Sequence, residues 1–117
     1  KYFSEYNIEL PKNIKVINPL GYIDMQSLLL ASKLVVTDSG GLQKEAFFAE
    51  KPSVILRDKT EWKELVDCGA SNLINYDHQS IFNQISSSLN KKITHKNIFG
   101  NSDTSVKICG LIMKNFS

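Results

Sequence analysis

The stretch Leu34-Val35-Val36-Thr37-Asp38-Ser39-Gly40-Gly41-Leu42 decides the fold. A nearly continuous apolar run ends at Thr37, and a short polar turn with two adjacent glycines follows it. An uninterrupted apolar run of this length is typical of a parallel strand that is covered on both faces. A helical pattern opens at about Leu42, so the stretch predicts a strand, a tight turn and a helix in succession.

The same alternation recurs along the chain. Short β-branched runs predict four strands, at residues 14–17, 34–37, 53–56 and 72–75. Apolar residues at helical spacing predict helices from an Asp24 cap to Ala31, over 42–49, over 61–68 behind a Thr60 cap, over 78–89 behind an Asp77 cap, and about 104–116. Gly69 stands where a helix end favours a left-handed residue. We therefore predict an α/β fold, a three-layer, Rossmann-like parallel sheet.

Composition narrows the possible functions. The 117 residues allow one domain, and a net charge of +2 with scattered Lys and Arg argues against binding of nucleic acid or an anionic membrane. The sequence has no apolar run near the roughly 20 residues that a spanning helix needs. Cys68 and Cys109 lack metal-ligand spacing, so we predict two buried, reduced thiols and no metal. Because the chain opens on Lys1 rather than Met, we read it as an excerpt of a longer protein.

The turn after the second predicted strand has the chemistry of a phosphate site. In open parallel sheets, ligands bind outside the carboxyl ends of the strands. A helix that starts there presents unpaired N–H groups and a partial positive charge to an anion. Gly40 and Gly41 allow close approach of the backbone, and Ser39 adds a hydroxyl donor. Glu45, one helical turn further on, is placed to accept hydrogen bonds from the two hydroxyls of a ribose.

Two common nucleotide motifs are missing from the turn. The G-x-G-x-x-G spacing of a dinucleotide fingerprint is absent, and no Gly-Lys-Ser or Gly-Lys-Thr of a P-loop follows the glycines. We therefore expect neither a dinucleotide nor any other cofactor, and the predicted ligand remains the diphosphate and ribose of a nucleotide.

Several segments together resemble one family. They are 37–46 (TDSGGLQKEA), Lys51-Pro52, 57–61 (RDKTE), 19–22 (PLGY) and 97–101 (NIFGN). In this order they resemble the carboxyl-terminal part of the non-hydrolysing UDP-N-acetylglucosamine 2-epimerases. The resemblance implies one half of a glycosyltransferase-B-type, two-domain architecture that holds the nucleotide sugar in the cleft between Rossmann-like halves. Residues 1–117 would then form the carboxyl-terminal nucleotide-sugar-binding domain, which is incomplete, and the amino-terminal domain would be absent.

The resemblance assigns roles to individual residues. Ser39, Gly40 and Gly41 would bind the diphosphate of UDP, and Glu45 would hold its ribose. The segment 19–25 would meet the uracil through backbone groups of Leu20 and through the side chain of Met25. That side chain is usually aromatic in the family, so a thioether contact replaces ring stacking here.

Further departures from the family pattern occur downstream. Ile98 stands at the usual Pro, and Ser102 stands at the usual second glycine of the following loop. Trp62-Lys63 replaces the common Arg-Pro, a variant that looks more like epimerases acting on UDP-2,3-diacetamido-glucuronic acid.

Other polar and aromatic residues have competing interpretations. Arg57 ends a predicted strand and would pair either with a ligand phosphate or carboxylate, or with Asp58 or Glu61. Acidic residues at a helix start stabilise the helix dipole, which is the expectation for Glu61 and Glu64. We expect Trp62 to serve in packing, Tyr22 either to line the pocket or to fill a strand end, and the two histidines, His78 and His95, to be exposed bystanders.

The implied reaction is elimination of UDP to a glycal, followed by re-addition with the opposite stereochemistry. In the family, the carboxylates that move protons come largely from the amino-terminal domain. We therefore assign no catalytic residue to this chain and expect it to show no epimerase turnover alone. The expected partners are a UDP-sugar, the missing domain and, in the parent protein, a second copy in a cytoplasmic homodimer. Two alternatives remain open: a glycosyltransferase-B sugar transferase and a non-catalytic UDP-sugar-binding domain.

Overall fold

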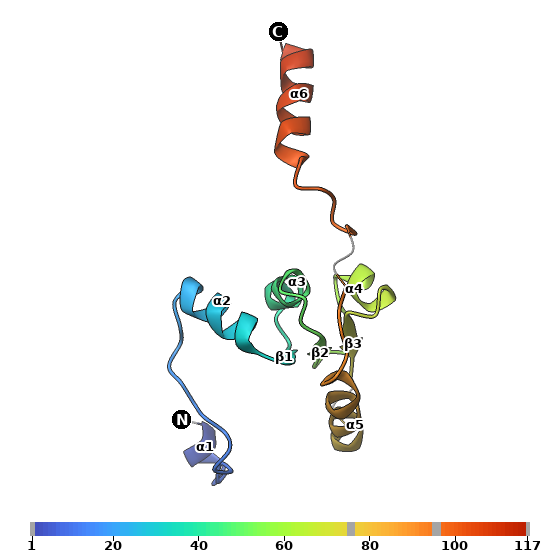
Figure 1. The fold of residues 1–117 in the computed structure, drawn as a ribbon. Coiled ribbons are helices and arrows are strands. Elements are labelled where there is room, and N and C mark those ends of the chain that lie inside the picture. Colours follow the sequence, from blue (N-terminus) through green and yellow to red (C-terminus); the bar gives the residue numbers. More distant parts are fainter. Residues whose placement is uncertain (1, 75–76, 95–96, 117) are drawn as a thin grey trace.

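A parallel sheet of three short strands forms the centre of the molecule (Figure 1). The strands are β1 (Val35–Thr37), β2 (Ser53–Ile55) and β3 (Ser71–Leu73), and they lie in the order β1-β2-β3. The computed structural model describes residues 2–74, 77–94 and 97–116. Three of the four predicted strands are therefore confirmed, with ends shifted by one or two residues and with Asn75 outside the described residues.

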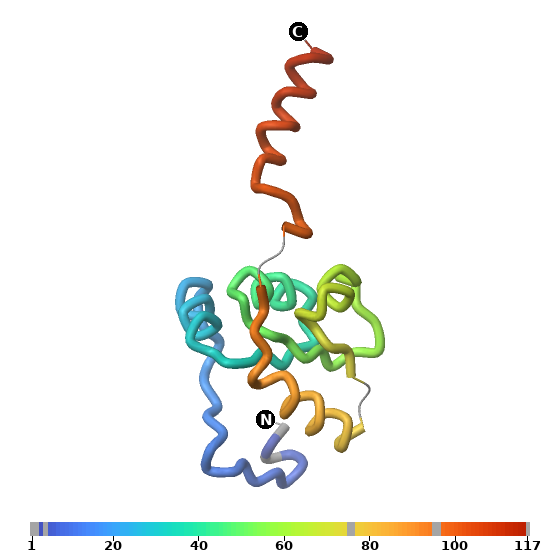
Figure 2. Tube along the Cα trace, turned by 45° about the vertical axis from the view of Figure 1, so that its right-hand side comes forward, coloured from blue at the N-terminus to red at the C-terminus, as the bar shows by residue number. Residues whose placement is uncertain are grey.

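Helices cover both faces of this sheet. The helices α3 (Gly40–Phe48) and α4 (Lys63–Asp67) lie on one side, and α5 (His78–Ser88) lies on the other in both views (Figures 1 and 2). Parallel neighbours need crossover connections, and α3 and α4 supply them between successive strands. The predicted three-layer arrangement is confirmed.

The core lies around β2 and the inner face of α3. All three residues of β2 are buried, which explains why its sequence shows no polar alternation. One cluster contains Leu29, Val35 and Ala46. A second cluster contains Phe47, Leu65 and Ala70, and half-buried Trp62, Cys68, Ile93, Ile98 and Phe99 pack against it.

The prediction of a strand at residues 14–17 is wrong. This segment runs from α1 (Tyr2–Glu5) toward α2 (Tyr22–Ala31) without regular structure, and it lies apart from the sheet in both views (Figures 1 and 2). Its apolar side chains are exposed, Val16 by 62%. β-branched residues favour extended backbone, but a strand also needs a neighbour that pairs its N–H and C=O groups.

Three helix starts differ from the predictions. Gly21 rather than Asp24 is the N-cap of α2, and Asp24 lies in the first turn, where a carboxylate still favours the helix dipole. α3 starts at Gly40, two residues before the predicted position, because Ser39 is its N-cap. α4 starts only at Lys63. The Thr60 hydroxyl accepts from the Trp62 backbone N–H (3.1 Å) and donates to Gln43 Oε1 (2.6 Å) instead of capping that helix.

Two predicted helix-end signals are confirmed. The Asp77 carboxylate caps α5 by accepting from the Ser80 backbone N–H at 2.9 Å, and this hydrogen bond lowers the pKa of Asp77. Gly69 follows α4 with φ +77°, the left-handed conformation that a side chain disfavours. The sequence places Ile81, Phe82, Ile85 and Leu89 on one apolar face of α5, and this prediction is only partly correct. Phe82 is 67% exposed, whereas Ser88 is buried and accepts from Asn72 Nδ2 at 3.0 Å.

The last helix, α6 (Thr104–Phe116), projects away from the α/β body (Figure 2). The helix itself was predicted, but none of its described residues is buried, and Val106 and Phe116 are 72% and 86% exposed. Cys109 on this helix is therefore exposed, which corrects the expectation of two buried thiols; Cys68 is half-buried, and both thiols are free. The projecting helix helps to give a radius of gyration of 18.2 Å, against about 13 Å for a compact domain of about 100 residues.

Candidate functional site

The turn between β1 and α3 has an accessible helix N-terminus. Ser39 is the N-cap in extended conformation, and its Oγ accepts a long hydrogen bond (3.4 Å) from the Leu42 N–H. Its own N–H donates to Thr37 Oγ1 at 3.0 Å, which ties the turn back to β1. Ser39 and Gly41 are exposed, so the start of α3, where the first N–H groups of a helix lack intrahelical partners, is accessible from solvent.

The two glycines of the turn differ in their surroundings. Both have ordinary negative φ, so the turn uses their lack of a side chain rather than their conformational freedom. A Cβ on Gly40 would overlap the Glu61 carboxylate. A Cβ on Gly41 would meet no closer atom than Ser39 Oγ, at 4.0 Å, so that side of the helix start is open.

An internal ion pair lies over this helix start. Arg57 donates from a guanidinium nitrogen to Glu61 Oε2 at 2.9 Å, and the same carboxylate lies against Gly40. Of the two interpretations of Arg57, the structure therefore shows the ion pair with Glu61. Glu61 lies before α4, and its carboxylate is next to Gly40 at the start of α3. Glu64 lies in the first turn of α4, as expected.

Trp62 also contacts the turn. Its indole Nε1 donates to the Gly40 carbonyl at 2.9 Å, and its ring packs edge-on against Phe99 with a centroid distance of 5.9 Å. The Lys44 ammonium lies 4.4 Å from the centre of the indole ring. The packing role predicted for Trp62 is confirmed, and its hydrogen bond to the turn is a contact that sequence reasoning missed.

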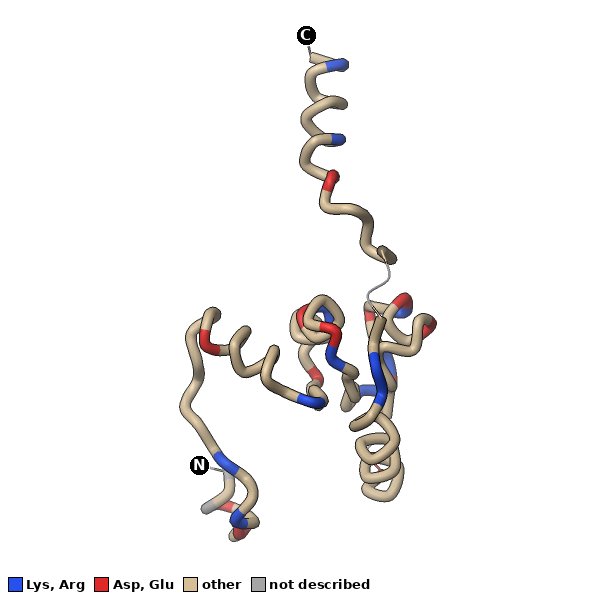
Figure 3. The backbone as a smooth tube through the Cα atoms, in the orientation of Figure 1, with Lys and Arg blue, Asp and Glu red and all other residues tan. Residues whose placement is uncertain are grey.

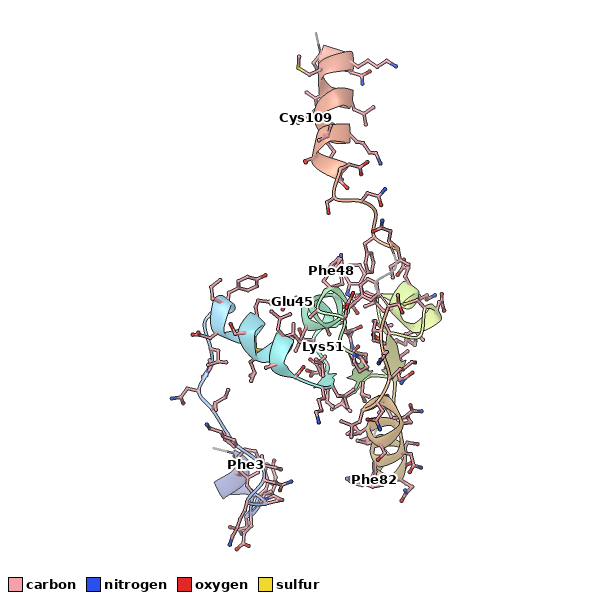
Figure 4. All side chains as sticks on the ribbon, in the orientation of Figure 1. Phe3, Glu45, Phe48, Lys51, Phe82 and Cys109 are labelled. Carbon is pink, nitrogen blue, oxygen red and sulfur yellow. The ribbon has the colours of Figure 1, made fainter. Side chains whose placement is uncertain are left out.

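Glu45 lies on the side of α3 that faces α2 (Figure 4). Its Oε2 accepts a 2.8 Å hydrogen bond from Gln26 Nε2 on α2. A cavity of about 210 Å³ lies beside this pair, lined by Tyr22, Gln26, Leu30, Glu45, Phe48 and Ala49. Tyr22, the first residue of α2, lines this cavity with a side chain that is 68% exposed, and it does not fill a strand end. Gln26 was missed, although it directly follows Met25, the last residue of the segment 19–25 that the resemblance turns toward the base.

Met25 and Leu20 occupy different environments. Met25 is half-buried and lines an apolar cavity of about 210 Å³ between α2, β1 and the start of α3. Leu20 is 41% exposed on the segment leading into α2 and lines neither of these two cavities. The structure thus brings Ser39, Gly40 and Gly41 together with Arg57 through Glu61, places Glu45 next to α2, and leaves Leu20 apart.

The remaining candidates from the sequence were the two histidines. His78 is exposed at the start of α5, and His95 lies outside the described residues. Residues 2–74, 77–94 and 97–116 contain no group of three His, Cys, Asp or Glu side chains able to hold a metal. Within the same ranges no helix has the length and apolarity required to cross a membrane. Lys and Arg occur along the whole described chain (Figure 3), and four of them, Lys33, Lys51, Lys91 and Lys92, line one cavity, which departs from the scattered distribution expected from the sequence.

A parallel α/β layer with an accessible helix N-terminus behind a strand end is an arrangement at which α/β proteins bind phosphate groups. The chain matches the protein family described as UDP-N-acetylglucosamine 2-epimerase over residues 1–113, and it belongs to that family.

Individual relatives agree with this assignment. The chain is 44% identical over 106 residues to the UDP-2,3-diacetamido-2,3-dideoxy-D-glucuronate 2-epimerase of Pseudomonas aeruginosa, covering 90% of this chain and 30% of that protein. It is 35% identical over 116 residues to the UDP-N-acetylglucosamine 2-epimerase of Methanocaldococcus jannaschii, covering 96% and 32%. The chain therefore spans less than a third of either relative.

Solved structures confirm the fold. The crystal structure of the Methanocaldococcus jannaschii UDP-GlcNAc 2-epimerase in complex with UDP-GlcNAc and UDP matches with a TM-score of 0.82 at 34% identity. This match covers 97% of our chain and 32% of that one. The α/β layer is accordingly that of the epimerases, which have the glycosyltransferase-B type of architecture.

Proposed function

We propose that this chain is the UDP-binding part of a UDP-sugar 2-epimerase. The observation that carries the proposal is the match, over nearly the whole chain, to an epimerase structure solved with UDP-GlcNAc and UDP. The accessible start of α3 and the cavity beside Glu45 supply the geometry. The family membership favours an epimerase over a sugar transferase or a non-catalytic binding domain.

The diphosphate binds at the start of α3 in this proposal. Ser39 donates its hydroxyl, and the backbone N–H groups of Gly40 and Gly41 donate to phosphate oxygens. The open space at Gly41 lets the phosphate approach the backbone. Arg57, now paired with the Glu61 carboxylate that lies against Gly40, would exchange that partner for the ligand.

The nucleoside extends from there toward α2. Glu45 accepts from the ribose hydroxyls, and its cavity of about 210 Å³ is smaller than the roughly 300–1,000 Å³ of complete ligand pockets. That size fits part of a nucleotide rather than a whole nucleotide sugar. The uracil meets the Met25 thioether and backbone groups of Leu20, and the sugar lies toward a part of the parent protein that this chain does not supply.

The reaction we propose for the parent protein is elimination of UDP and its re-addition. Developing charge on a leaving diphosphate is stabilised by oriented N–H donors, and the α3 turn supplies them. No residue of this chain is assigned to proton transfer. The substrate is a UDP-2-acetamido sugar, and the 44% identity to the diacetamido-glucuronate enzyme, with Trp62-Lys63 at the variant position, supports a modified sugar.

The proposal extends to the parent protein. Its amino-terminal domain would close the cleft, two copies would form a homodimer, and both would reside in the cytoplasm. The first statement is supported by the length of the relatives, of which this chain covers 30% and 32%. Size-exclusion chromatography of the parent protein and fractionation of its cells test the last two.

Calorimetric titration with UDP tests the assignment of Glu45. Glu45→Ala removes a charged acceptor, so we expect the binding free energy to fall by about 1–3 kcal/mol. Glu64→Ala, which removes an exposed carboxylate on α4, is the matched control and should bind as the unmodified chain does. Equal affinities of the Glu45 variant and the control would contradict the ribose assignment.

A further inference from the structure

A polar contact between two side chains joins α2 to α3 at the proposed ribose site. Gln26 Nε2 donates to Glu45 Oε2 at 2.8 Å, although the two residues are 19 positions apart. Both side chains are half-buried, and both line the cavity of about 210 Å³. From this contact, and resting on the proposed function, we infer that Gln26 is a positioning residue that orients Glu45 for the ribose hydroxyls.

The chemistry of the pair suits this role. An ionised carboxylate has two oxygens and room for about four hydrogen bonds, so one amide donor on Oε2 leaves Oε1 and further lone pairs for two hydroxyls. An amide is uncharged, so it holds the carboxylate without neutralising the charge that strengthens hydrogen bonds to a ligand. A Lys or Arg at position 26 would instead pair with that charge.

The surroundings of Glu45 explain why its carboxylate needs a hydrogen-bond donor such as Gln26. Glu45 has a long, flexible side chain on a face of α3 that opens into a cavity, where apolar neighbours such as Leu30 and Phe48 offer the carboxylate no hydrogen bond. A carboxylate fixed before the ligand arrives loses less conformational freedom on binding. Because α2 also carries Met25, one helix would set both the base contact and the ribose acceptor.

The competing explanation is that Gln26 only ties α2 to α3. The two roles differ in what they couple to. A purely structural tie would affect stability and all ligands alike, whereas a positioning role acts through Glu45 and through the ribose hydroxyls. A double-mutant cycle and a ligand lacking one hydroxyl separate them.

The test is calorimetric titration of the chain with UDP and with 2′-deoxy-UDP. Gln26→Met keeps the length and apolar stem of the side chain but removes the donor. Gln79→Met, which removes an exposed amide donating to Asn83 on α5, is the matched control. We expect Gln26→Met to weaken UDP binding by about 3- to 10-fold, to weaken 2′-deoxy-UDP binding less, and to have no effect beyond that of Glu45→Ala in the double variant.

The outcomes separate the two proposals. If Glu45→Ala weakens UDP binding but Gln26→Met does not, the positioning role is overturned and the ribose assignment stands. If Gln26→Met weakens binding equally with and without Glu45, its role is structural and the inference fails. If the unmodified chain does not bind UDP, or if Glu45→Ala has no effect, the proposed function of this site fails first and the inference falls with it.

Discussion

At the start of α3, two neighbouring glycines perform different tasks. Gly40 gives room to an internal carboxylate, that of Glu61, and Gly41 leaves an accessible surface. The Glu61 carboxylate lies where the partial positive charge of the helix favours an anion. A negative group of the chain itself therefore lies beside the helix start that is the proposed diphosphate site.

Alanine at each glycine separates these tasks. Gly41→Ala should leave thermal stability unchanged or slightly higher, because Ala suits a helix better and has the space. The same variant should weaken UDP binding about tenfold or more, because its Cβ intrudes on a phosphate at the helix start. Gly40→Ala should displace Glu61 at little cost in stability, since the exposed Arg57–Glu61 pair contributes only about 0–1 kcal/mol. Thermal melts and UDP titration of both variants measure this, and unchanged binding by Gly41→Ala would count against the diphosphate assignment.

At the scale of elements, β2 and β3 are joined by a buried hydroxyl pair. Ser53 Oγ and Ser71 Oγ lie 2.7 Å apart, and both residues are almost fully buried. Ser53→Ala leaves the Ser71 hydroxyl without this partner, so we expect a loss of about 1–3 kcal/mol in the free energy of unfolding. Removing both hydroxyls should cost less than the sum of the single changes. Urea denaturation of the two single variants and the double variant measures the coupling, and strict additivity would refute it.

The N-cap of α5 predicts a pH dependence. The hydrogen bond from Ser80 lowers the pKa of Asp77 below its ordinary value of 3.8, so folding favours the ionised carboxylate. The stabilisation is complete above pH 3.8 and is lost as the pH falls through the lowered, folded-state pKa. Asp77→Ala should therefore melt at a lower temperature than the unmodified chain at neutral pH, and the gap should narrow in strong acid. A gap that stays constant across the acid range would exclude the ionised cap as its cause.

At the scale of the whole molecule, α6 stands outside the α/β body. Its apolar residues, among them Val106, Leu111 and Phe116, are all more than half exposed. Such a surface favours self-association. We expect deletion of residues 104–117 to leave the melting temperature of the body unchanged and to reduce self-association. Sedimentation velocity and thermal melts check this; a large loss of stability would show that α6 packs on the body in solution.

Local patterns in the sequence already determined much of this protein. Apolar runs predicted β1, β2 and β3, because a buried strand excludes polar residues over its whole length. Asp77 and Gly69 mark helix ends through interactions within a few residues, so each could be recognised without the fold. The order of its short motifs indicated the epimerase family, because each motif consists of consecutive residues and needs no tertiary contact to be recognised.

Only the tertiary structure decided the features that depend on contacts between residues distant in the sequence. The run at 14–17 has strand residues but no neighbouring strand to pair with, and α6 has a helical pattern but no described surface to cover. The contacts of Gln26 with Glu45 and of Trp62 with Gly40 join residues 19 and 22 positions apart. No local pattern predicts such contacts, because they exist only once packing has brought two helices, or a loop and a helix start, to hydrogen-bonding distance.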